Sequence, residues 1–305
     1  RGTTAGKPGP GRKMRAVLGG AAAACVVLLG VFHACFAEAG AKKEQVVIYT
    51  NADDEAVEAI RHTLDSCGYS GEYLLQSFGT SELGGKLLAE GTDIEADLVS
   101  MSSFYLDSAQ EQNHMFADLE FSAPTLQETP DYYKPITCQE GALIVNTRVM
   151  EEQGLPMPES AADLADPVYK NMISVTDIKS SSTGWLLIQD LVSGYGEEEA
   201  RELLTGIYEN AGPHIEDSGS GPIKKVRSGE VAIGFGLRHQ AVEDKEAGRP
   251  IDYIDPIEGN FSLTESVAVI DKGEDTDPKA MEMAECIVKN GRKELQQIYP
   301  HPLYQ

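Results

Sequence analysis

The sequence predicts an α/β protein, in which a mostly parallel sheet is flanked by helices. Short apolar runs alternate with segments whose apolar residues recur every three or four positions, as expected for strands and amphipathic helices. The alternation comes in two series, which the segment Pro130–Pro135 separates. At 305 residues the chain is long enough for two domains. No internal repeat of 20 to 50 residues is found, so a solenoid is not expected.

The first series begins with residues 45–49, where Gln-Val-Val-Ile-Tyr is typical of a short buried strand. A helix is predicted over residues 53–64, because Val57, Ile60 and Leu64 fall on one helical face. The same criteria predict further strands at 72–78 and 97–101, and helices at 81–90 and 104–112.

The second series continues the alternation toward the C-terminus. Strands are predicted at 141–146, 172–176, 231–235, 251–254 and 265–270, and helices at 185–192, 197–210, 239–247 and 278–289. The last strand and helix are expected to return to the first domain. The chain ends at residues 301–305 without a closing element, so both a truncated C-terminus and a short tail are compatible with it.

The N-terminal region has the pattern of a secretory signal. Basic residues at 12–15 precede the uncharged run 16–32, and small residues follow as far as Ala39. Residues 1–39 are therefore expected to lie outside the mature fold, and the protein is expected to be exported. Two kinds of processing stay open. Cleavage after Ala39 would give a periplasmic or extracellular protein, and lipid attachment at Cys35 would give a cell-surface lipoprotein. A membrane-spanning helix is a weaker alternative, since the run of about 17 residues is short for a span.

Charge excludes one class of partner. After position 35 the chain holds 49 acidic residues against 20 basic ones, a formal net charge of −29. Nucleic-acid binding depends on Lys and Arg contacts to phosphates, so no nucleic-acid partner is expected.

The later cysteines do not form a metal-binding or redox motif. Cys67, Cys138 and Cys286 are unevenly spaced, and no CxxC pair occurs. Buried free thiols are expected, with one disulfide as the alternative.

The loops that follow the predicted strands carry the candidate site. Ligands of open parallel sheets bind beyond the carboxyl ends of the strands. These loops are rich in hydroxyl groups and glycines, and almost no carboxylates are expected among them, which predicts a donor-rich pocket for an anion. The candidate ligand-binding residues are Asn51, Thr80, Ser81, Ser102, Ser103, Ser182, Thr183, Gly184, Trp185, Ser218, Ser220, Arg238 and His239.

The stretch Ser180-Ser-Ser-Thr-Gly184 is the most informative of these loops, because it precedes a predicted helix. A cap needs a single hydroxyl, and this loop has four. The N–H groups of a helix start attract anions, and the planar guanidinium of Arg238 can bind two oxygens at once. The surplus hydroxyls are therefore expected to face the oxyanion of a ligand.

Motifs of catalysis and of metal binding are not found. The sequence lacks HExxH, the P-loop, GxGxxG after a strand and the GxSxG elbow. The six histidines are scattered. We therefore expect no catalytic residue, no metal and no cofactor, and the protein is not expected to be an enzyme.

From about residue 44 to 300 the chain resembles the type 2 periplasmic binding proteins of ABC importers. Within this class it is most similar to the branch that holds ferric, hexose-phosphate and 2-aminoethylphosphonate binders. The segments that carry the resemblance are Val47-Ile-Tyr-Thr-Asn51, Ala96-Asp-Leu-Val-Ser100, Ser182-Thr-Gly-Trp185, Ser218-Gly-Ser-Gly-Pro-Ile-Lys-Lys-Val226, Gly229-Glu-Val-Ala-Ile233 and Glu258-Gly-Asn-Phe-Ser-Leu-Thr-Glu-Ser-Val-Ala-Val269.

The resemblance implies two α/β lobes that close on a solute around a two-segment hinge. Lobe 1 would comprise residues 44–138 and 265–305, and lobe 2 residues 139–264. The hinge would lie near 137–142 and 260–265. The implied partners are a small anionic solute and the permease subunits of an ABC importer in the membrane, and a monomer is expected.

Within this branch the residues favour a solute with a phosphate or phosphonate group. The ferric members carry adjacent tyrosines at the place that His239 and Gln240 hold here, so ferric ion is disfavoured. Ferric ion, a dicarboxylate, a polyamine or a thiamine-like solute are the alternatives for a transport protein. A sensory ectodomain of the same fold is a further alternative, and a secreted hydrolase is the least favoured.

Overall fold

Nine strands form one mixed sheet in residues 45–305, the part of the chain that the computed structural model describes. Their order across the sheet is β2-β1-β3-β9-β4-β7-β5-β6, and β8 pairs with β4. The strands are β1 (Val46–Thr50), β2 (Tyr73–Ser77), β3 (Leu98–Ser102), β4 (Lys134–Asn146), β5 (Ile173–Thr176), β6 (Ile215–Glu216), β7 (Ile233–Leu237), β8 (Ile251–Ile254) and β9 (Ser262–Val269).

The helices lie between these strands and after the last one. They are α2 (Asp54–Ser66), α3 (Thr80–Glu90), α4 (Ser103–Asn113), α5 (Thr147–Gln153), α6 (Thr183–Ala211), α7 (Gly221–Ser228), α8 (Arg238–Glu246), α9 (Pro278–Asn290) and α10 (Arg292–Ile298). The predicted α/β class is thus confirmed. Helix α6 joins two segments that the sequence predicts as separate helices, and its backbone leaves helical geometry at Gly196, with φ of 79°. The sequence analysis missed α5, α10 and β6.

Strand directions divide the sheet into two parallel groups with antiparallel strands between them. In one group β1 is parallel to both β2 and β3, and in the other β5 is parallel to both β6 and β7. Strands β4 and β9 are antiparallel to each other and to their outer neighbours β7 and β3. The sheet is therefore more mixed than the sequence predicts.

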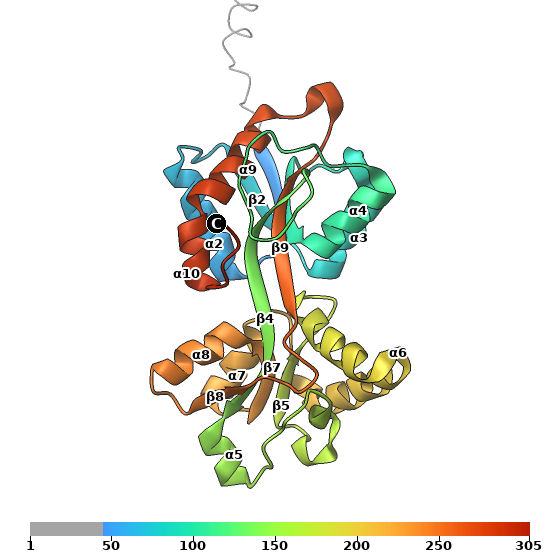
Figure 1. The fold of residues 1–305 in the computed structure, drawn as a ribbon, viewed down its shortest axis with the longest axis vertical. Helices are drawn as coiled ribbons and strands as arrows, with labels where there is room; N and C mark the ends of the chain where they lie inside the picture. The colour runs from blue at the N-terminus through green and yellow to red at the C-terminus, as the bar shows by residue number, and fades with distance from the viewer. Residues whose placement is uncertain (1–44) are drawn as a thin grey trace, which may run out of the picture. The chain divides into compact units, whose positions relative to one another are not determined.

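The long strands β4 and β9 connect the two groups, and Figure 1 shows them side by side. The first part of β4, Lys134–Glu140, pairs with β9, and the second part, Gly141–Asn146, pairs with β7 and β8. Both predicted hinge segments fall on these strands or directly before them. The motion of the hinge and the lobe boundaries stay predictions.

Apolar residues with the predicted spacings form the cores on the two faces of the sheet. Under α2 and α9, the side chains of Ile60, Leu98 and Ile287 share one buried cluster. On the other face, under α3 and α4, Leu83 and Leu106 belong to a second one. Separate clusters underlie α6, and α7 together with α8. Burial of the apolar face of each helix holds that helix on the sheet.

The expectation of free thiols is wrong for Cys67 and Cys286. Cys67, at the end of α2, and Cys286, in α9, form a disulfide that joins positions 219 residues apart. Only the tertiary fold brings them together, with their Cα atoms 6.6 Å apart. Cys138 is a buried free thiol within the described chain, as expected. The predicted signal region, with Cys35 and Ala39, lies outside the described residues.

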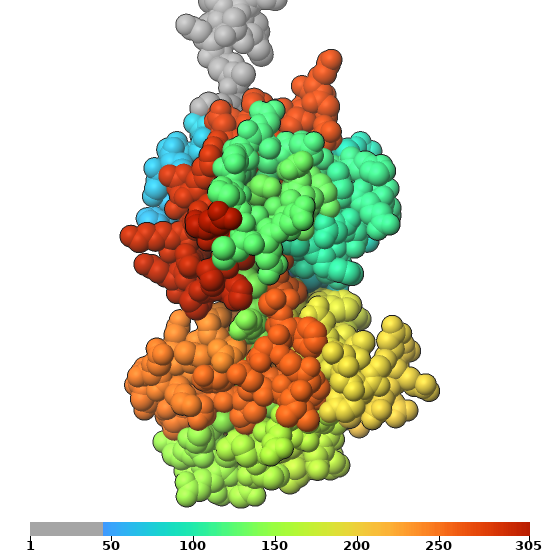
Figure 2. Space-filling model, in the orientation of Figure 1, coloured from blue at the N-terminus to red at the C-terminus, as the bar shows by residue number. Residues whose placement is uncertain are grey.

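The C-terminal segment closes on the fold rather than leaving it. Tyr304 pairs with Thr125 in an antiparallel bridge, and the Leu126 N–H donates to the Leu303 carbonyl at 2.9 Å. In Figure 2 this dark red segment lies against the green one on the surface. None of the helices between residues 45 and 305 is both long and apolar enough to cross a membrane.

Candidate functional site

A cavity of about 420 Å³ opens where the ends of β1 and β2 meet the loops before α6 and α7. The chain segments that line it come from both groups of strands. Its lining residues are Asn51, Ala52, Asp53, Asp54, Glu55, Phe78, Gly79, Glu82, Ser180, Ser181, Asp217, Ser218, Ser220 and Lys224. We call it the cleft cavity. Of the thirteen predicted ligand-binding residues, Asn51, Ser218 and Ser220 line it.

The predicted donors at the start of α3 already have partners in the chain. The backbone N–H of Thr80 donates to the Ser180 carbonyl at 3.2 Å, and that of Ser81 to the Lys179 carbonyl at 2.9 Å. The Thr80 hydroxyl accepts from Asn51 Nδ2 at 2.9 Å. These bonds join the start of α3 to the loop before α6. The helix start therefore binds another part of the chain, whereas the sequence predicts that it binds a ligand.

The four hydroxyls around the start of α6 are also partnered. Ser180 Oγ donates to Asp177 at 2.9 Å, and Ser181 Oγ accepts from the Thr183 N–H at 3.3 Å. Ser182 Oγ donates to Glu265 Oε1 at 2.9 Å, and Thr183 Oγ1 donates to Gln139 at 3.4 Å. Ser180 and Ser181 line the cleft cavity, whereas Ser182 and Thr183 face the strands beneath it.

Gly184 and Trp185 serve packing in this structure. A Cβ at Gly184 would lie 3.0 Å from the Ile178 Cα, so the absence of a side chain lets the loop pack closely. Trp185 packs against the core under α6. Its indole nitrogen has no hydrogen-bond partner among residues 45–305.

The loop Ser218–Gly221 closes one wall of the cleft cavity. Ser220 Oγ accepts from Gln240 Nε2 at 3.0 Å. Gly219 packs so tightly that a Cβ would collide with Thr183 Oγ1 and lie 3.1 Å from Asp53 Oδ2. Its backbone N–H donates to Asp53, which places the start of α2 against this loop.

Arg238 and His239 do not line the cleft cavity. Arg238 forms a forked ion pair with Asp255, at 2.8 and 3.1 Å, and its guanidinium lies 4.5 Å from the centre of the Tyr253 ring. The pair lowers the pKa of Asp255. His239 packs its ring 5.3 Å from that of Tyr299, and burial lowers its pKa to about 4, so it is neutral at physiological pH.

The two serines at the start of α4 also lie elsewhere. Ser102 is buried at the end of β3. Ser103 Oγ contacts Ser266 Oγ at 2.8 Å and donates to the Thr264 carbonyl at 3.1 Å. Ser103 lines a separate cavity of about 260 Å³, which also contains Cys138.

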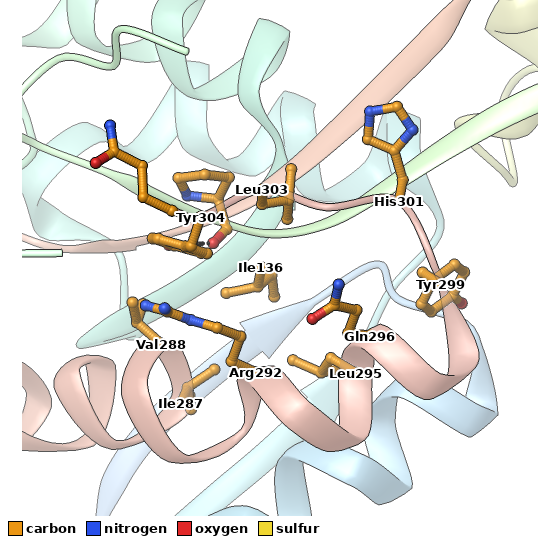
Figure 3. A pocket seen from close by; sticks show the side chains of 12 residues that line it. Ile136, Ile287, Val288, Arg292, Leu295, Gln296, Tyr299, His301, Leu303 and Tyr304 are labelled. Carbon is orange, nitrogen blue, oxygen red and sulfur yellow. Dashed lines mark hydrogen bonds between the residues drawn. The ribbon is translucent and has the colours of Figure 1, made fainter. Parts of the chain in front are cut away.

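A third cavity, of about 140 Å³, lies between α10, the end of α9 and the C-terminal segment. Figure 3 shows Arg292 and Tyr304 facing each other in it. The Arg292 guanidinium lies 3.6 Å from the centre of the Tyr304 ring, a close cation–π contact. The chain's own C-terminal segment therefore forms part of the wall of this cavity.

The lining of the cleft cavity corrects one expectation, because carboxylates are abundant there. Five acidic residues line it against one basic residue, Lys224; the acidic ones are Asp53, Asp54, Glu55, Glu82 and Asp217. Acidic residues in the first turn of a helix are ordinary, since they interact favourably with the helix dipole. That makes them easy to overlook, although the sequence Asn51-Ala-Asp-Asp-Glu55 shows three of them directly after β1.

Glu265 contacts two of the predicted residues, Ser182 and Asn51, although the sequence gives little reason to select it. It lies on β9 opposite Ser102 and Thr137 and is only 4% exposed. Burial and the nearby Asp53 raise its pKa to about 7, while Ser182 and Asn51 act in the opposite direction. Burial also raises the pKa of Asp53 itself. Among residues 45–305, no group of three or more His, Cys, Asp or Glu residues is arranged to hold a metal ion.

The arrangement of strands and helices is that of a type 2 periplasmic binding protein. The periplasmic binding protein P5PA matches with a TM-score of 0.69 at 18% identity, over 86% of this chain and 85% of that one. AfuA from Actinobacillus pleuropneumoniae, with fructose-6-phosphate bound, matches with a TM-score of 0.68 at 21% identity, over 86% and 85%. Iron-bound HitA from Pseudomonas aeruginosa matches with a TM-score of 0.67 at 18% identity, over 86% and 87%.

The family follows from the sequence comparison. Residues 96–291 match the family of bacterial extracellular solute-binding proteins, and the chain belongs to this family. It is also 26% identical over 150 residues to an uncharacterized protein from Haemophilus influenzae, a match that covers 49% of this chain. The matched part spans less than half of that relative, 43% of its length.

Proposed function

We propose that this protein captures a small organic phosphate or phosphonate in the cleft cavity and delivers it to the permease subunits of an ABC importer. Family membership supports the coarser part of this proposal, the binding of a solute outside the cytoplasm. The similarity to AfuA, whose structure has fructose-6-phosphate bound, is consistent with the finer part.

One observation carries the choice of solute. The wall of the cleft cavity formed by the loops before α6 and α7 presents the hydroxyl groups of Ser181, Ser218 and Ser220 and one cation, Lys224. Helix α7 begins directly after this wall, at Gly221. Hydroxyl donors, a lysine ammonium and a helix N-terminus are together the groups that bind phosphate oxygens in proteins.

In the proposed mechanism the solute stabilises a closed arrangement of the two predicted lobes. The bonds from Thr80 and Ser81 to the carbonyls of Ser180 and Lys179 already join segments of both lobes without a solute. A solute that contacts both walls adds affinity for the closed state only, and so shifts the population toward it. The solute would be bound and released without any covalent change.

A second candidate, a purely cationic solute such as a polyamine, is favoured by the five carboxylates in the lining. The two candidates differ in the wall they use. A phosphate needs Lys224 and the serines, whereas a polyamine needs the acidic start of α2.

The test is thermal unfolding of the protein with a panel of solutes: 2-aminoethylphosphonate, phosphate, hexose phosphates, dicarboxylates, spermidine, thiamine and ferric citrate. A solute at 100 times its Kd adds about 2.7 kcal/mol of stability. We expect a rise in Tm with a phosphate or phosphonate, and its loss in Lys224→Met. Lys170→Met, at an exposed lysine that does not line the cleft cavity, is the matched control. A shift with spermidine or thiamine alone would refute the proposal.

A further inference from the structure

The cavity of about 140 Å³ beside α10 contains an arginine without an acidic partner, Arg292. We propose that this cavity is a second binding site, which takes a small monocarboxylate with its carboxylate on Arg292 and its apolar part against the walls. The site shares no lining residue with the cleft cavity, so the inference does not depend on the solute proposed above.

The charge of Arg292 is not neutralised by the described chain. Other arginines of residues 45–305 form ion pairs with acidic side chains, namely Arg61, Arg148, Arg227, Arg238 and Arg249. Arg201 has no ion pair in the same range, but it is exposed to solvent on α6. Arg292 is only partly exposed, and its close contact is with the ring of Tyr304. It is thus a partly buried cation beside a cavity, with no carboxylate of residues 45–305 to compensate for it.

The contact with Tyr304 leaves the donors of Arg292 available. The ring centre lies 3.6 Å from the guanidinium carbon, so the ring covers the face of the group, whereas the N–H donors point outward in its plane. Nε is buried without a hydrogen-bond partner among the described residues. The two terminal nitrogens are accessible and form no bond within residues 45–305. Two such parallel donors match the two oxygens of a carboxylate.

The lining of this cavity also favours an anion, because it includes no acidic residue. Five acidic residues line the cleft cavity, and one lines the cavity that contains Cys138. The other ionisable nitrogen in the lining belongs to His301, whose Nδ1 already lies 3.5 Å from Glu140 Oε1. Arg292 is therefore the group that would bind the anion.

The apolar walls and the volume restrict the kind of anion. Ile136 on β4, Ile287 and Val288 on α9 and Leu295 on α10 line the cavity and are buried. Figure 3 shows Ile136 and Leu295 on the side of Arg292 that faces Tyr299. Apolar walls suit a hydrocarbon chain, whereas they leave the oxygens of a phosphate or of a second carboxylate without donors. A cavity of about 150 Å³ can hold benzene, so this one admits a chain of about five carbons.

The cavity is formed without a ligand, because hydrogen bonds hold the C-terminal segment in place over it. Tyr304 Oη donates to the Pro135 carbonyl at 2.5 Å, and the Leu126 N–H donates to the Leu303 carbonyl at 2.9 Å. A site that is already formed loses little conformational entropy when a ligand binds. A ligand this small can therefore bind measurably.

The experiment compares two ligands that differ only in the carboxylate, isovalerate and 3-methylbutan-1-ol. Each is titrated into the full chain at pH 7, with the methyl groups of Ile, Leu and Val observed by NMR. We expect isovalerate to shift the methyl resonances of Ile136, Val288 and Leu295. It should bind at least tenfold more tightly than the alcohol, because a carboxylate on a guanidinium makes charge-assisted bonds that an alcohol cannot make.

Two variants of Arg292 test its role. Arg292→Met should reduce the preference for isovalerate over the alcohol to below about twofold, while the alcohol still binds to the apolar walls. Arg292→Lys keeps the charge but loses the parallel donors, and should show an intermediate preference. Lys293→Met is the matched control, since it removes one positive charge at the exposed next position, which does not line the cavity.

Three outcomes would overturn the inference. One is equal binding of isovalerate and the alcohol, or methyl shifts that occur only away from this cavity. Another is undiminished isovalerate binding in Arg292→Met when the methyl spectrum shows the variant to be folded. Displacement of isovalerate by an equal concentration of inorganic phosphate would refute the choice of a carboxylate. None of these results bears on the solute of the cleft cavity.

Discussion

Two polar clusters in this protein contrast in how completely their charges are paired. Around Arg238, the guanidinium bonds both oxygens of Asp255 and packs on Tyr253, and Asn260 donates to Asp255 at 3.0 Å. Around Glu265, the carboxylate has one hydroxyl donor and no bonded cation among the described residues. The first cluster is complete within the protein, and the second has unused acceptors beside a cavity.

The contrast shows why residue type alone is a weak guide to a ligand site. Arginine is the best oxyanion receptor among the side chains, and Arg238 is for that reason the most prominent candidate in the sequence. The guanidinium of Arg238 is already bonded to the carboxylate of Asp255, seventeen positions further along the chain. A buried glutamate is less conspicuous, yet it has an acceptor free. Available hydrogen-bonding capacity, rather than residue type, distinguishes the two.

The largest effect is expected for Glu265→Gln, measured on stability without solute. The pKa of Glu265 is raised from 4.5 to about 7, so the folded state retains a proton that the unfolded chain loses. Stability should therefore fall as the pH rises from about 4.5 to 7. Glutamine removes this loss, and the variant should be up to about 3 kcal/mol more stable than the parent at pH 8 and nearly equal to it at pH 4. Urea unfolding at both pH values gives the difference.

Asp190→Asn provides the control for this prediction. Burial and the nearby Glu258 raise the pKa of Asp190 to about 8, so its replacement should also stabilise the protein at high pH. It should not change solute binding, because Asp190 lies on α6 and does not line the cleft cavity. A pH profile of stability that Glu265→Gln leaves unaltered would mean that Glu265 has no raised pKa.

A smaller effect, about 2 kcal/mol of lost stability, is expected for Gly219→Ala, because overpacking a tight contact typically costs 1–3 kcal/mol. The new methyl group would collide with Thr183 and press on Asp53, displacing the wall of the cleft cavity. Solute affinity should fall together with stability. Gly85→Ala, where the added methyl meets open space, is the control and should not lower affinity. Unchanged affinity in Gly219→Ala would exclude this loop from the site.

The smallest effect is expected for Arg238→Ala. The ion pair with Asp255 is partly exposed to solvent, so its loss should cost only about 1 kcal/mol. We expect phosphonate affinity to change less than in Lys224→Met, as titration calorimetry of both variants can measure. If Arg238→Ala abolishes binding while Lys224→Met does not, the sequence-based choice of Arg238 is right and the pair with Asp255 must open for the solute.

The sequence by itself determined the order of elements and the class of fold. Strands such as Val46–Thr50 and Leu98–Ser102 and helices such as α2 and α9 follow from periodicity, which is a local property of the chain. It also indicated loops that line the cleft cavity. Three of the predicted residues, Asn51, Ser218 and Ser220, line the cleft cavity.

Only the tertiary structure decided which polar groups face one another. The Cys67–Cys286 disulfide, the bond from Ser182 to Glu265 and the contact of α3 with the Ser180 loop all join residues distant in sequence. Pairing of β9 with β3 and β4 places Glu265 opposite Ser102 and Thr137, and no local pattern encodes that neighbourhood. The state of a hydroxyl or carboxylate depends on its partner in space, so the sequence indicates which loops line the cleft cavity but not which of their side chains lack a partner.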